Sequence, residues 1–443
     1  MMNRFLTIVS VCAAVPAFAA LPEISNLTVS QPQSGKPVTV SYGLSHDAVV
    51  TADILTNGVS IGAQRFERIS GDINCKVNAG ASRSFTWQMR KDWPNQKLNV
   101  SVRLRAWLPG AAPDYMVVDL LKGGAKRFYA SAEDVPGGVT DEQYKTDKLV
   151  MRRVHAAGEV WRMGQPATGE RCNGNSESVY EYQLKDNETA HLVGFTEDYY
   201  IGIYEVTQRQ YLNVTGSNPS DSKAGSSTDR YDGSKCRPVE KVSYNMLRGT
   251  SVSWPQNGHA VDSGSVIQKF RQKLGLQSAD LPTDAQWEFA CRAGTQSALN
   301  SGLECKDAIS AHADGNLEVL GWYFGNANVN SKNTDRSGPR DVGLKQPNAW
   351  GLYDMHGNVH EVCLDWMSKG DAWRATFVSD WKQGGVTIDP VGATSGTSRV
   401  NRGGDYWYSS AWARSACRTG YVCDPSLTTM HIGFRLVCNG TLD

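Results

Sequence analysis

The sequence predicts an all-β module near the N-terminus followed by a larger α+β domain. Three observations lead to this prediction. Between Leu21 and Leu121, short runs of alternating apolar and polar residues recur between turn signals, which is typical of antiparallel strands. From Lys148 onward the pattern is irregular, with short helical segments separated by long polar loops. The 443 residues include 43 Gly and 13 Trp, which favours a loop-rich fold anchored by aromatic side chains.

The first segment, Met1–Ala19, has the pattern of an export signal. Arg4 supplies the positive start, Phe5–Val15 the apolar run, and Ala17–Ala19 the small-residue cleavage pattern. We therefore expect an exported protein (periplasmic, cell-surface or secreted) whose mature chain begins at Ala20. An uncleaved anchor is the alternative. No later stretch approaches the roughly eighteen apolar residues of a spanning helix, so we expect no membrane insertion.

Charge and cysteine content narrow the class of protein further. Lys plus Arg and Asp plus Glu number 45 each, so no overall charge favours nucleic acid. Of the 10 Cys, all but Cys12 follow the signal, where disulfides can persist. The remaining number is odd, so at least one stays a thiol. Cys417 and Cys423 are close enough to pair locally, and the absence of a CxxC spacing weakens a zinc or thioredoxin-like interpretation.

The module, residues 20–121, should be a sandwich of short strands. It resembles the immunoglobulin or fibronectin type III class, which implies a spacer or adhesion element. Cys75 has no partner inside it for an inter-sheet disulfide. The expected strands are Leu27–Ser30, Val38–Tyr42, Val49–Leu55, Ser84–Met89, Asn99–Trp107 and Tyr115–Leu120.

A linker is predicted at residues 122–147, because this stretch is rich in small and acidic residues and carries the turn Val135–Gly138. The second domain would then span residues 148–443. Three short helices are expected in it, at Gln208–Asn213, Ser265–Leu274 and Asp284–Ala293, the last preceded by Pro282.

The most unusual stretch of the second domain is Gly351–Trp366, GLYDMHGNVHEVCLDW. Its polarity and irregular period predict a loop that holds something. A calcium ion fits Asp354 and Glu361 as carboxylate ligands with the carbonyl groups of Gly357 and Val359. A purely structural turn is one alternative. Another is a zinc or iron site at His356 and His360, although Gly357 and Asn358 argue against the helix that this spacing requires.

The same stretch resembles the GLYDMxGNVWEW signature of the formylglycine-generating enzyme, or sulfatase-modifying factor, family. Four further motifs resemble the family in the same order: YIGIYEVTQRQYLNVTGSNPS (Tyr200–Ser220), PVEKVSY (Pro238–Tyr244), LPTDAQWEFACRAGT (Leu281–Thr295), and RVNRGG with GFRLV (Arg399–Gly404 and Gly433–Val437). The resemblance implies a duplicated, C-type-lectin-like α+β fold with low secondary-structure content and structural calcium.

The resemblance also implies an activity whose residues are not all present. Family enzymes oxidise a substrate Cys to formylglycine, using oxygen and a copper(I) ion held by two Cys a few residues after the RGGS turn. Here Tyr408 stands at the first Cys position and Ser410–Ala413 covers the second. Copper is therefore not expected, because soft thiolates select copper(I). A displaced pair, Cys417 and Cys423, is the alternative, and the catalytic residues are unknown.

Around the changed turn, Asp405 replaces the Ser of RGGS. Its neighbours form an aromatic cluster, and a binding site is predicted at Arg402, Asp405, Tyr406, Trp407, Tyr408 and Trp412. Filling of the core is the alternative role. Three functions follow. The first is a non-catalytic protein that binds a peptide, a protein or a glycan. The second is a formylglycine-generating oxidase, and the third is an iron-dependent enzyme related to C–S bond-forming family members. The first agrees best with the missing Cys pair, and no nucleic-acid partner is expected.

Overall fold

A computed structural model of the chain describes residues 20–30, 36–62, 66–94, 100–165, 188, 190–222, 235–305, 314–327, 338–367, 385–418 and 424–440. The export signal predicted at Met1–Ala19 lies outside these residues, as does Cys423. None of the helices within them is long and apolar enough to cross a membrane.

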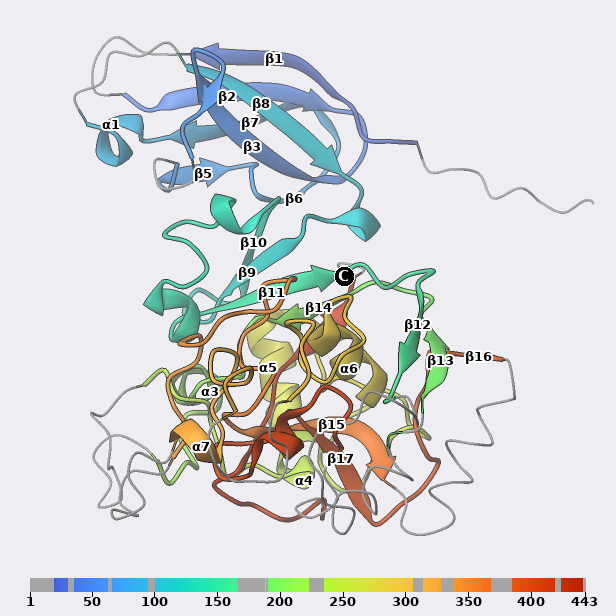
Figure 1. Ribbon diagram of the computed structural model, residues 1–443. Coiled ribbons are helices and arrows are strands. Elements are labelled where there is room, and N and C mark those ends of the chain that lie inside the picture. The colour runs from blue at the N-terminus through green and yellow to red at the C-terminus, as the bar shows by residue number, and fades with distance from the viewer. Residues whose placement is uncertain are drawn as a thin grey trace, which may run out of the picture.

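The N-terminal module consists of two small antiparallel sheets around one apolar core (Figure 1). The first sheet has the order β1 (Ile24–Ser30), β2 (Val38–Leu44), β7 (Gly80–Trp87) and β5 (Ile69–Gly71). The second has β4 (Val59–Ser60), β3 (Ala48–Thr56) and β6 (Cys75–Val77), and β8 (Val100–Trp107) pairs with β3. A short helix, α1 (Met89–Asp92), follows β7. The alternating runs thus form strands because their apolar residues share one core.

The strand expected last in the module belongs to a different sheet. This antiparallel sheet has the order β10 (Ala125–Tyr129), β9 (Tyr115–Asp119), β11 (Lys148–Val154), β14 (Tyr199–Gly202) and β19 (Val437–Asn439). β9, which lies before the predicted boundary at Leu121, thus pairs with two strands that lie after it. Alternation in a sequence identifies a strand, but it does not identify the partner strand.

The predicted linker is ordered and joins the two parts. It contains β10 and two short turns of 3-10 helix, Ala132–Asp134 and Glu142–Lys145. The Phe128 N–H donates to the Asn74 carbonyl oxygen at 2.8 Å, and the Arg127 side chain donates to the Ile73 carbonyl oxygen at 2.7 Å. In Figure 1, β9 and β10 lie between the module and the larger domain. Small and acidic residues here signal turns rather than a flexible tether.

The three predicted helices are present as α3 (Gln208–Thr215), α5 (Val266–Leu274) and α6 (Asp284–Arg292). The hydroxyl groups of Thr207, Ser265 and Thr283 each accept a backbone N–H of the first turn, which fixes where these helices begin. Two shorter helices were not predicted, α4 (Tyr244–Arg248) and α7 (Phe324–Ala327).

Two further small sheets complete the second domain. One has the order β12 (Val160–Met163), β13 (His191–Gly194) and β16 (Val386–Ile388), and the other has β17 (Ser398–Arg402), β15 (His360–Met367) and β18 (Ile432–Gly433). Helices are few and the described strands are short, as expected for an α+β fold of low secondary-structure content.

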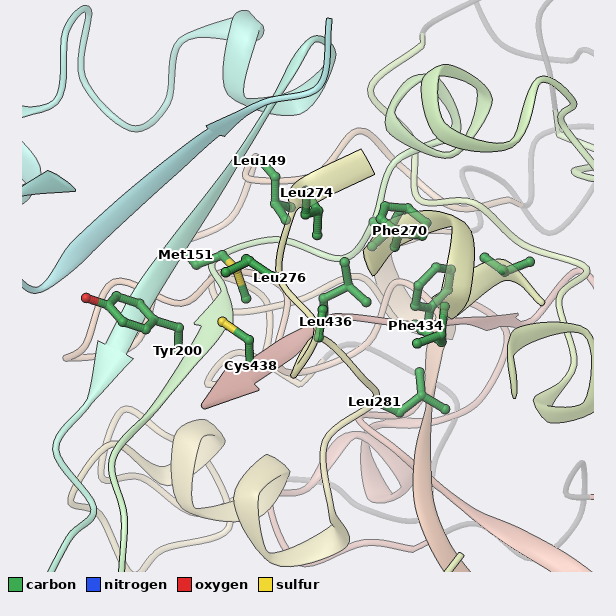
Figure 2. Packing of buried hydrophobic residues seen from close by; sticks show 14 of the residues in the cluster. Leu149, Met151, Tyr200, Phe270, Leu274, Leu276, Leu281, Phe434, Leu436 and Cys438 are labelled. Carbon is green, nitrogen blue, oxygen red and sulfur yellow. The ribbon is translucent and has the colours of Figure 1, made fainter. Parts of the chain in front are cut away.

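The largest core of the second domain brings distant segments together. Figure 2 shows Leu149 and Met151 of β11 near Leu276, with Leu274 of α5 and Leu436 close by. Phe434, in the closing GFRLV motif, lies edge-to-face with Phe270 of α5, with ring centroids 5.9 Å apart. The closing motif is thus part of the core that holds the domain together.

Candidate functional site

The central stretch Gly351–Trp366 is half loop and half strand. In the loop, Asp354 and Asn358 adopt the left-handed backbone region, at φ 56° and 63°. A Cβ at Gly357 would lie 2.0 Å from the Trp322 carbonyl oxygen, so only glycine fits there. From His360 the chain continues as β15, contrary to the prediction of a loop throughout. The partner strands β17 and β18 come from much later in the chain, so local polarity could not reveal them.

Glu361 is held by a buried arginine from the closing motif. The Arg435 guanidinium donates to both carboxylate oxygens, with Nη2 to Oε1 at 2.7 Å and Nε to Oε2 at 2.9 Å. The Trp287 indole N–H of α6 also donates to Oε2, at 2.8 Å. Arg435 is fully buried and Glu361 is 1% exposed. This arrangement ties β15, α6 and the closing motif together.

Two more carboxylates lie in the same buried region. Glu205 accepts the Asn358 amide at 2.6 Å and the Val359 N–H at 3.1 Å. Asp354 accepts the Gly343 N–H on Oδ2 at 2.7 Å, while Oδ1 is buried without a hydrogen-bond partner. Burial raises the pKa of Asp354 to about 6, and burial with the neighbouring Asp354 and Glu361 carboxylates raises the pKa of Glu205 well above its usual range. We call these groups, Glu205, Asp354, Glu361 and Arg435, the loop cluster.

The loop cluster fits the predicted calcium ion only in part. The unpartnered Oδ1 of Asp354 and the excess of carboxylates over guanidinium groups both favour a cation. Glu361 does not fit well as a ligand, because both of its oxygens accept hydrogen bonds from Arg435 and Trp287. Among the residues that the structure describes, no group of three or more His, Cys, Asp or Glu is arranged to hold a metal ion. Calcium at Asp354, Gly357, Val359 and Glu361 therefore stays a prediction.

The alternative His site is not assembled. His356 and His360 do not share a helix, because the loop turns at Gly357 and β15 begins at His360. His356 Nδ1 lies 2.6 Å from the Ala413 carbonyl oxygen, and the Asn300 N–H donates to Nε2 at 3.0 Å. Burial lowers the pKa of His356 to about 4. Both nitrogens of a neutral ring are thus used in structural hydrogen bonds.

Asp405 anchors the changed turn from within. One carboxylate oxygen, Oδ1, accepts the N–H groups of Trp407 and Tyr408, at 2.8 and 2.9 Å. The other, Oδ2, lies 3.0 Å from His431 Nδ1 and 3.6 Å from His360 Nε2. Asp405 and His360 are each 1% exposed. Asp405 is therefore a positioning residue that fixes the backbone of the two aromatic residues after it.

The aromatic residues around this turn form a surface that we call the aromatic shelf: Phe324, Trp407, Tyr408, Trp412 and His431. Phe324 meets Trp407 edge-on with ring centroids 6.5 Å apart, and Tyr408 lies 5.6 Å from Trp412. Trp407 is 45% exposed and Phe324 is 36% exposed, both high for large apolar side chains. Exposed aromatic groups with fixed geometry are typical of binding surfaces.

Two predicted binding residues lie beneath the shelf rather than on it. Arg402 is fully buried, where its guanidinium pairs with Asp284 and, at 2.8 Å, with Glu288. Tyr406 is also fully buried and stacks on His431, with centroids 5.3 Å apart. Neither side chain can meet a ligand at the surface in this conformation. A motif position locates a residue along the chain, but it does not say which way the side chain points.

The positions of the family copper ligands carry no thiol. Tyr408 is part of the shelf, and Ser410–Ala413 forms a single 3-10 turn. Cys417 is buried, which raises the pKa of its thiol to about 12, so it is not a ready thiolate. Cys423 lies outside the described residues, so the displaced-pair alternative is untested. Cys75, Cys291, Cys363 and Cys417 are free thiols in the structure.

Sequence reasoning missed two members of the shelf. Phe324 lies far from Trp407 in the sequence, and its N–H donates to the Tyr408 carbonyl oxygen at 2.9 Å. His431 stands two residues before the closing GFR motif, which was the available signal, but nothing in the sequence showed that it faces Asp405.

Comparison with known families identifies the family of the second domain. The family model of the sulfatase-modifying factor enzyme 1-like domain matches residues 157–440, more than half of the chain. The chain therefore belongs to this family, to which the motifs at Tyr200, Leu281 and Gly351 already pointed.

Proteins similar to this chain are named for different functions. Over 215 residues the chain is 28% identical to a chaperone protein LppX of Paenibacillus barcinonensis, covering 42% of this chain and 69% of that one. It is 32% identical over 157 residues to a formylglycine-generating enzyme of Thermomonospora curvata, covering 35% of this chain and 48% of the enzyme. Among solved structures, Treponema denticola variable protein 1 matches with a TM-score of 0.45 and 23% identity, covering 66% of this chain and 95% of that one.

Proposed function

We propose that this protein is an exported, non-catalytic member of its family that binds a peptide or a glycan on the aromatic shelf. The observation that carries the proposal is the exposure of Trp407 and Phe324 beside a turn whose backbone is fixed by the buried Asp405. A rigid aromatic surface loses little conformational entropy when a ligand binds, so it suits recognition.

The residues at the copper positions support binding over oxidation. A phenol, hydroxyl groups, an indole and methyl groups stand where soft sulfur donors are needed, at Tyr408 and Ser410–Ala413. The relative named as a chaperone is consistent with a non-catalytic role. The relatives named as formylglycine-generating enzymes keep oxidation as the second candidate, although the chain spans only about half the length of the first of them.

The rest of the architecture fits a binding protein. We propose that the second domain is the duplicated C-type-lectin-like fold implied by the motifs, with calcium stabilising the loop around Asp354. The module before it, similar to immunoglobulin or fibronectin type III domains, would act as a spacer that presents the shelf. The paired sheets around one core support the latter assignment.

Binding is tested with immobilised peptide and glycan arrays, followed by affinity measurements on the best probe of each class. We expect Trp407→Ala to weaken the selected probe at least tenfold, because it removes the most exposed ring of the shelf. Leu121→Ala, which removes an exposed apolar side chain at 57% exposure away from the shelf, is the matched control. Equal binding by Trp407→Ala and the parent protein would contradict the proposed site.

Catalysis is tested by incubating the protein with copper, oxygen and a peptide that carries the sulfatase Cys motif. Mass spectrometry should show no conversion of the Cys to the aldehyde. Conversion that disappears in the Cys417→Ser, Cys423→Ser double variant would establish a displaced copper pair. Conversion that survives in that variant would refute the assignment of the site. Bound iron in the purified protein would favour the third function.

A further inference from the structure

A pocket of about 280 Å³ lies where the module meets the segment that follows β10. It is far along the chain from the aromatic shelf. The module side is formed by β3, β8 and the turn at β4, and the other side by Tyr129, Ala130 and Asp134 after β10. Figure 1 shows β10 directly beside the module at this junction. The ordered residues of the predicted linker thus form one side of this pocket.

A buried amide lines this pocket. Asn74 is 4% exposed and adopts the left-handed region at φ 53°. Its backbone N–H donates to the Val50 carbonyl oxygen, and its carbonyl oxygen accepts the Phe128 N–H. The side-chain amide can both donate and accept hydrogen bonds, so Asn74 offers a polar guest in the pocket a partner of either kind.

Both signs of charge are present at the pocket. Asp53 accepts the Ser60 hydroxyl at 2.6 Å and keeps only a loose pair with Arg103, at 3.9 Å. Asp134 binds Ser131 through one carboxylate oxygen, Oδ2. The Arg105 guanidinium lies over the Trp107 ring, 3.6 Å from its centroid. Burial raises the pKa of Asp134, and repulsion from the Asp53 carboxylate adds to this effect, so the two carboxylates interact electrostatically.

We infer that this pocket binds a small dipolar molecule with an ammonium and a carboxylate group, of which a free α-amino acid is the simplest case. The ammonium group is placed at Asp53 and Asp134, the carboxylate at Arg103 and Arg105, and the Asn74 amide hydrogen-bonds the ligand from the buried side. This site is independent of the shelf, so the inference goes beyond the proposed function.

Other small ligands fit the pocket less well. A simple cation would pair with the two carboxylates and leave the two guanidinium groups without a partner, and a simple anion would do the reverse. A sugar is usually held against an exposed aromatic face, whereas the two aromatic side chains of this pocket, Phe66 and Tyr129, are buried. A pocket of this volume also excludes a folded partner.

The test uses the full chain and measures melting temperature and calorimetric binding with each of the twenty free amino acids, with glucose and galactose as neutral probes. We expect at least one amino acid to bind with a Kd below about 1 mM and to raise the melting temperature. Asn74→Gly, which tolerates the left-handed backbone, should weaken that amino acid at least tenfold. Arg105→Gln should do the same without touching the buried amide.

Two controls make the outcome decisive. Arg90→Gln changes an exposed arginine of the module away from the pocket and should bind as the parent does. Trp407→Ala should also leave amino-acid binding unchanged, which separates this site from the shelf. No binding of any amino acid, binding of sugars alone, or unchanged affinity in both pocket variants would each overturn the inference.

Discussion

Two buried charge clusters hold the second domain together, and they are built differently. The α6 cluster surrounds the carboxylates of Asp284 and Glu288 with three guanidinium groups, those of Arg292, Arg402 and Arg418. The loop cluster has three carboxylates and the single guanidinium of Arg435. The first has one more guanidinium group than carboxylates, whereas the second has two more carboxylates than guanidinium groups.

The protonation equilibria follow this difference. Burial alone would raise the pKa of Glu288, but the three guanidinium groups outweigh this effect and lower the pKa to about 2. In the loop cluster, burial and like charges raise the pKa values of Glu205 and Asp354 instead. The effect of the guanidinium groups is local. Asp365 lies beside Asp284, and burial together with the Asp284 carboxylate raises the pKa of Asp365 to about 7. A carboxylate surrounded by guanidinium groups stays charged and acts as a structural element, whereas an excess of carboxylates leaves room for a cation or a proton.

The largest effect is expected for Glu288→Gln in the α6 cluster. This change leaves three buried guanidinium groups with one carboxylate, so we expect a loss of about 3–5 kcal/mol in the free energy of unfolding. Because the pKa of Glu288 is lowered on folding, its contribution is present above about pH 4 and is lost as the pH falls towards about 2. Denaturant unfolding at pH 7 and pH 3 measures both effects.

The matched control for this change is Glu197→Gln, which neutralises an exposed glutamate of the same domain. It should change the unfolding free energy by less than about 0.5 kcal/mol. If Glu288→Gln costs as little as the control, the α6 cluster does not stabilise the fold through its charges.

Another buried carboxylate, that of Glu240, tests the effect of burial on a pKa and on stability. One oxygen accepts the Ser222 N–H at 2.8 Å, the other is buried without a hydrogen-bond partner, and burial raises its pKa to about 7. The folded protein then holds this proton more tightly than the unfolded chain does. Stability should therefore fall, by at most about 3 kcal/mol, as the pH rises from about 4 to about 7.

Glu240→Gln should flatten this part of the stability profile and be more stable than the parent above about pH 7. Thermal unfolding of both proteins across pH 4 to about 8 is the measurement. If the stability of the parent protein and that of the variant depend on pH in the same way, the pKa of Glu240 is not raised by folding.

Calcium is the test of the loop cluster. If a cation balances the excess charge, calcium at about one hundred times its Kd should stabilise the parent by about 2.7 kcal/mol, and Asp354→Asn should abolish this gain. Glu361→Gln should destabilise the protein with or without calcium, because it weakens the pair with Arg435. Melting curves with calcium and with a chelator separate the two roles. The contrary outcome has two parts: the chelator leaves the melting curve of the parent protein unchanged, and the Asp354→Asn variant is more stable than the parent. Together these would mean that a proton, not a cation, balances the loop cluster.

Much of the fold could be predicted from local sequence. The helices at Gln208, Val266 and Asp284 follow directly from capping residues that act within one turn. The sheet of β9 could not be predicted, because the pairing of β9 with β11 depends on which strands meet after folding. For the same reason, β15 was expected to be part of a loop.

The positions of the predicted binding residues follow from the sequence where these residues are close neighbours along the chain. Asp405, Trp407, Tyr408 and Trp412 stand within one short segment, and the structure brings them together. The roles of Arg402 and Glu361 were not predictable, because each is set by a partner far along the chain: Glu288 for Arg402 and Arg435 for Glu361. A sequence shows that a charge is present, but burial decides whether it faces a ligand or another charge.

The smallest effect on stability is expected for Trp407→Ala, which contrasts the exposed shelf with both buried clusters. The ring is 45% exposed and meets Phe324 and His431 at centroid distances of 6.5 and 6.1 Å, so it contributes little to the core. The free energy of unfolding should change by less than about 1 kcal/mol, while binding of the selected probe should weaken at least tenfold. Tyr406→Phe, a change at a fully buried ring beneath the shelf, is the comparison within the same turn. If Trp407→Ala unfolds the domain instead, the ring is part of the core, and the shelf is a structural surface rather than a binding one.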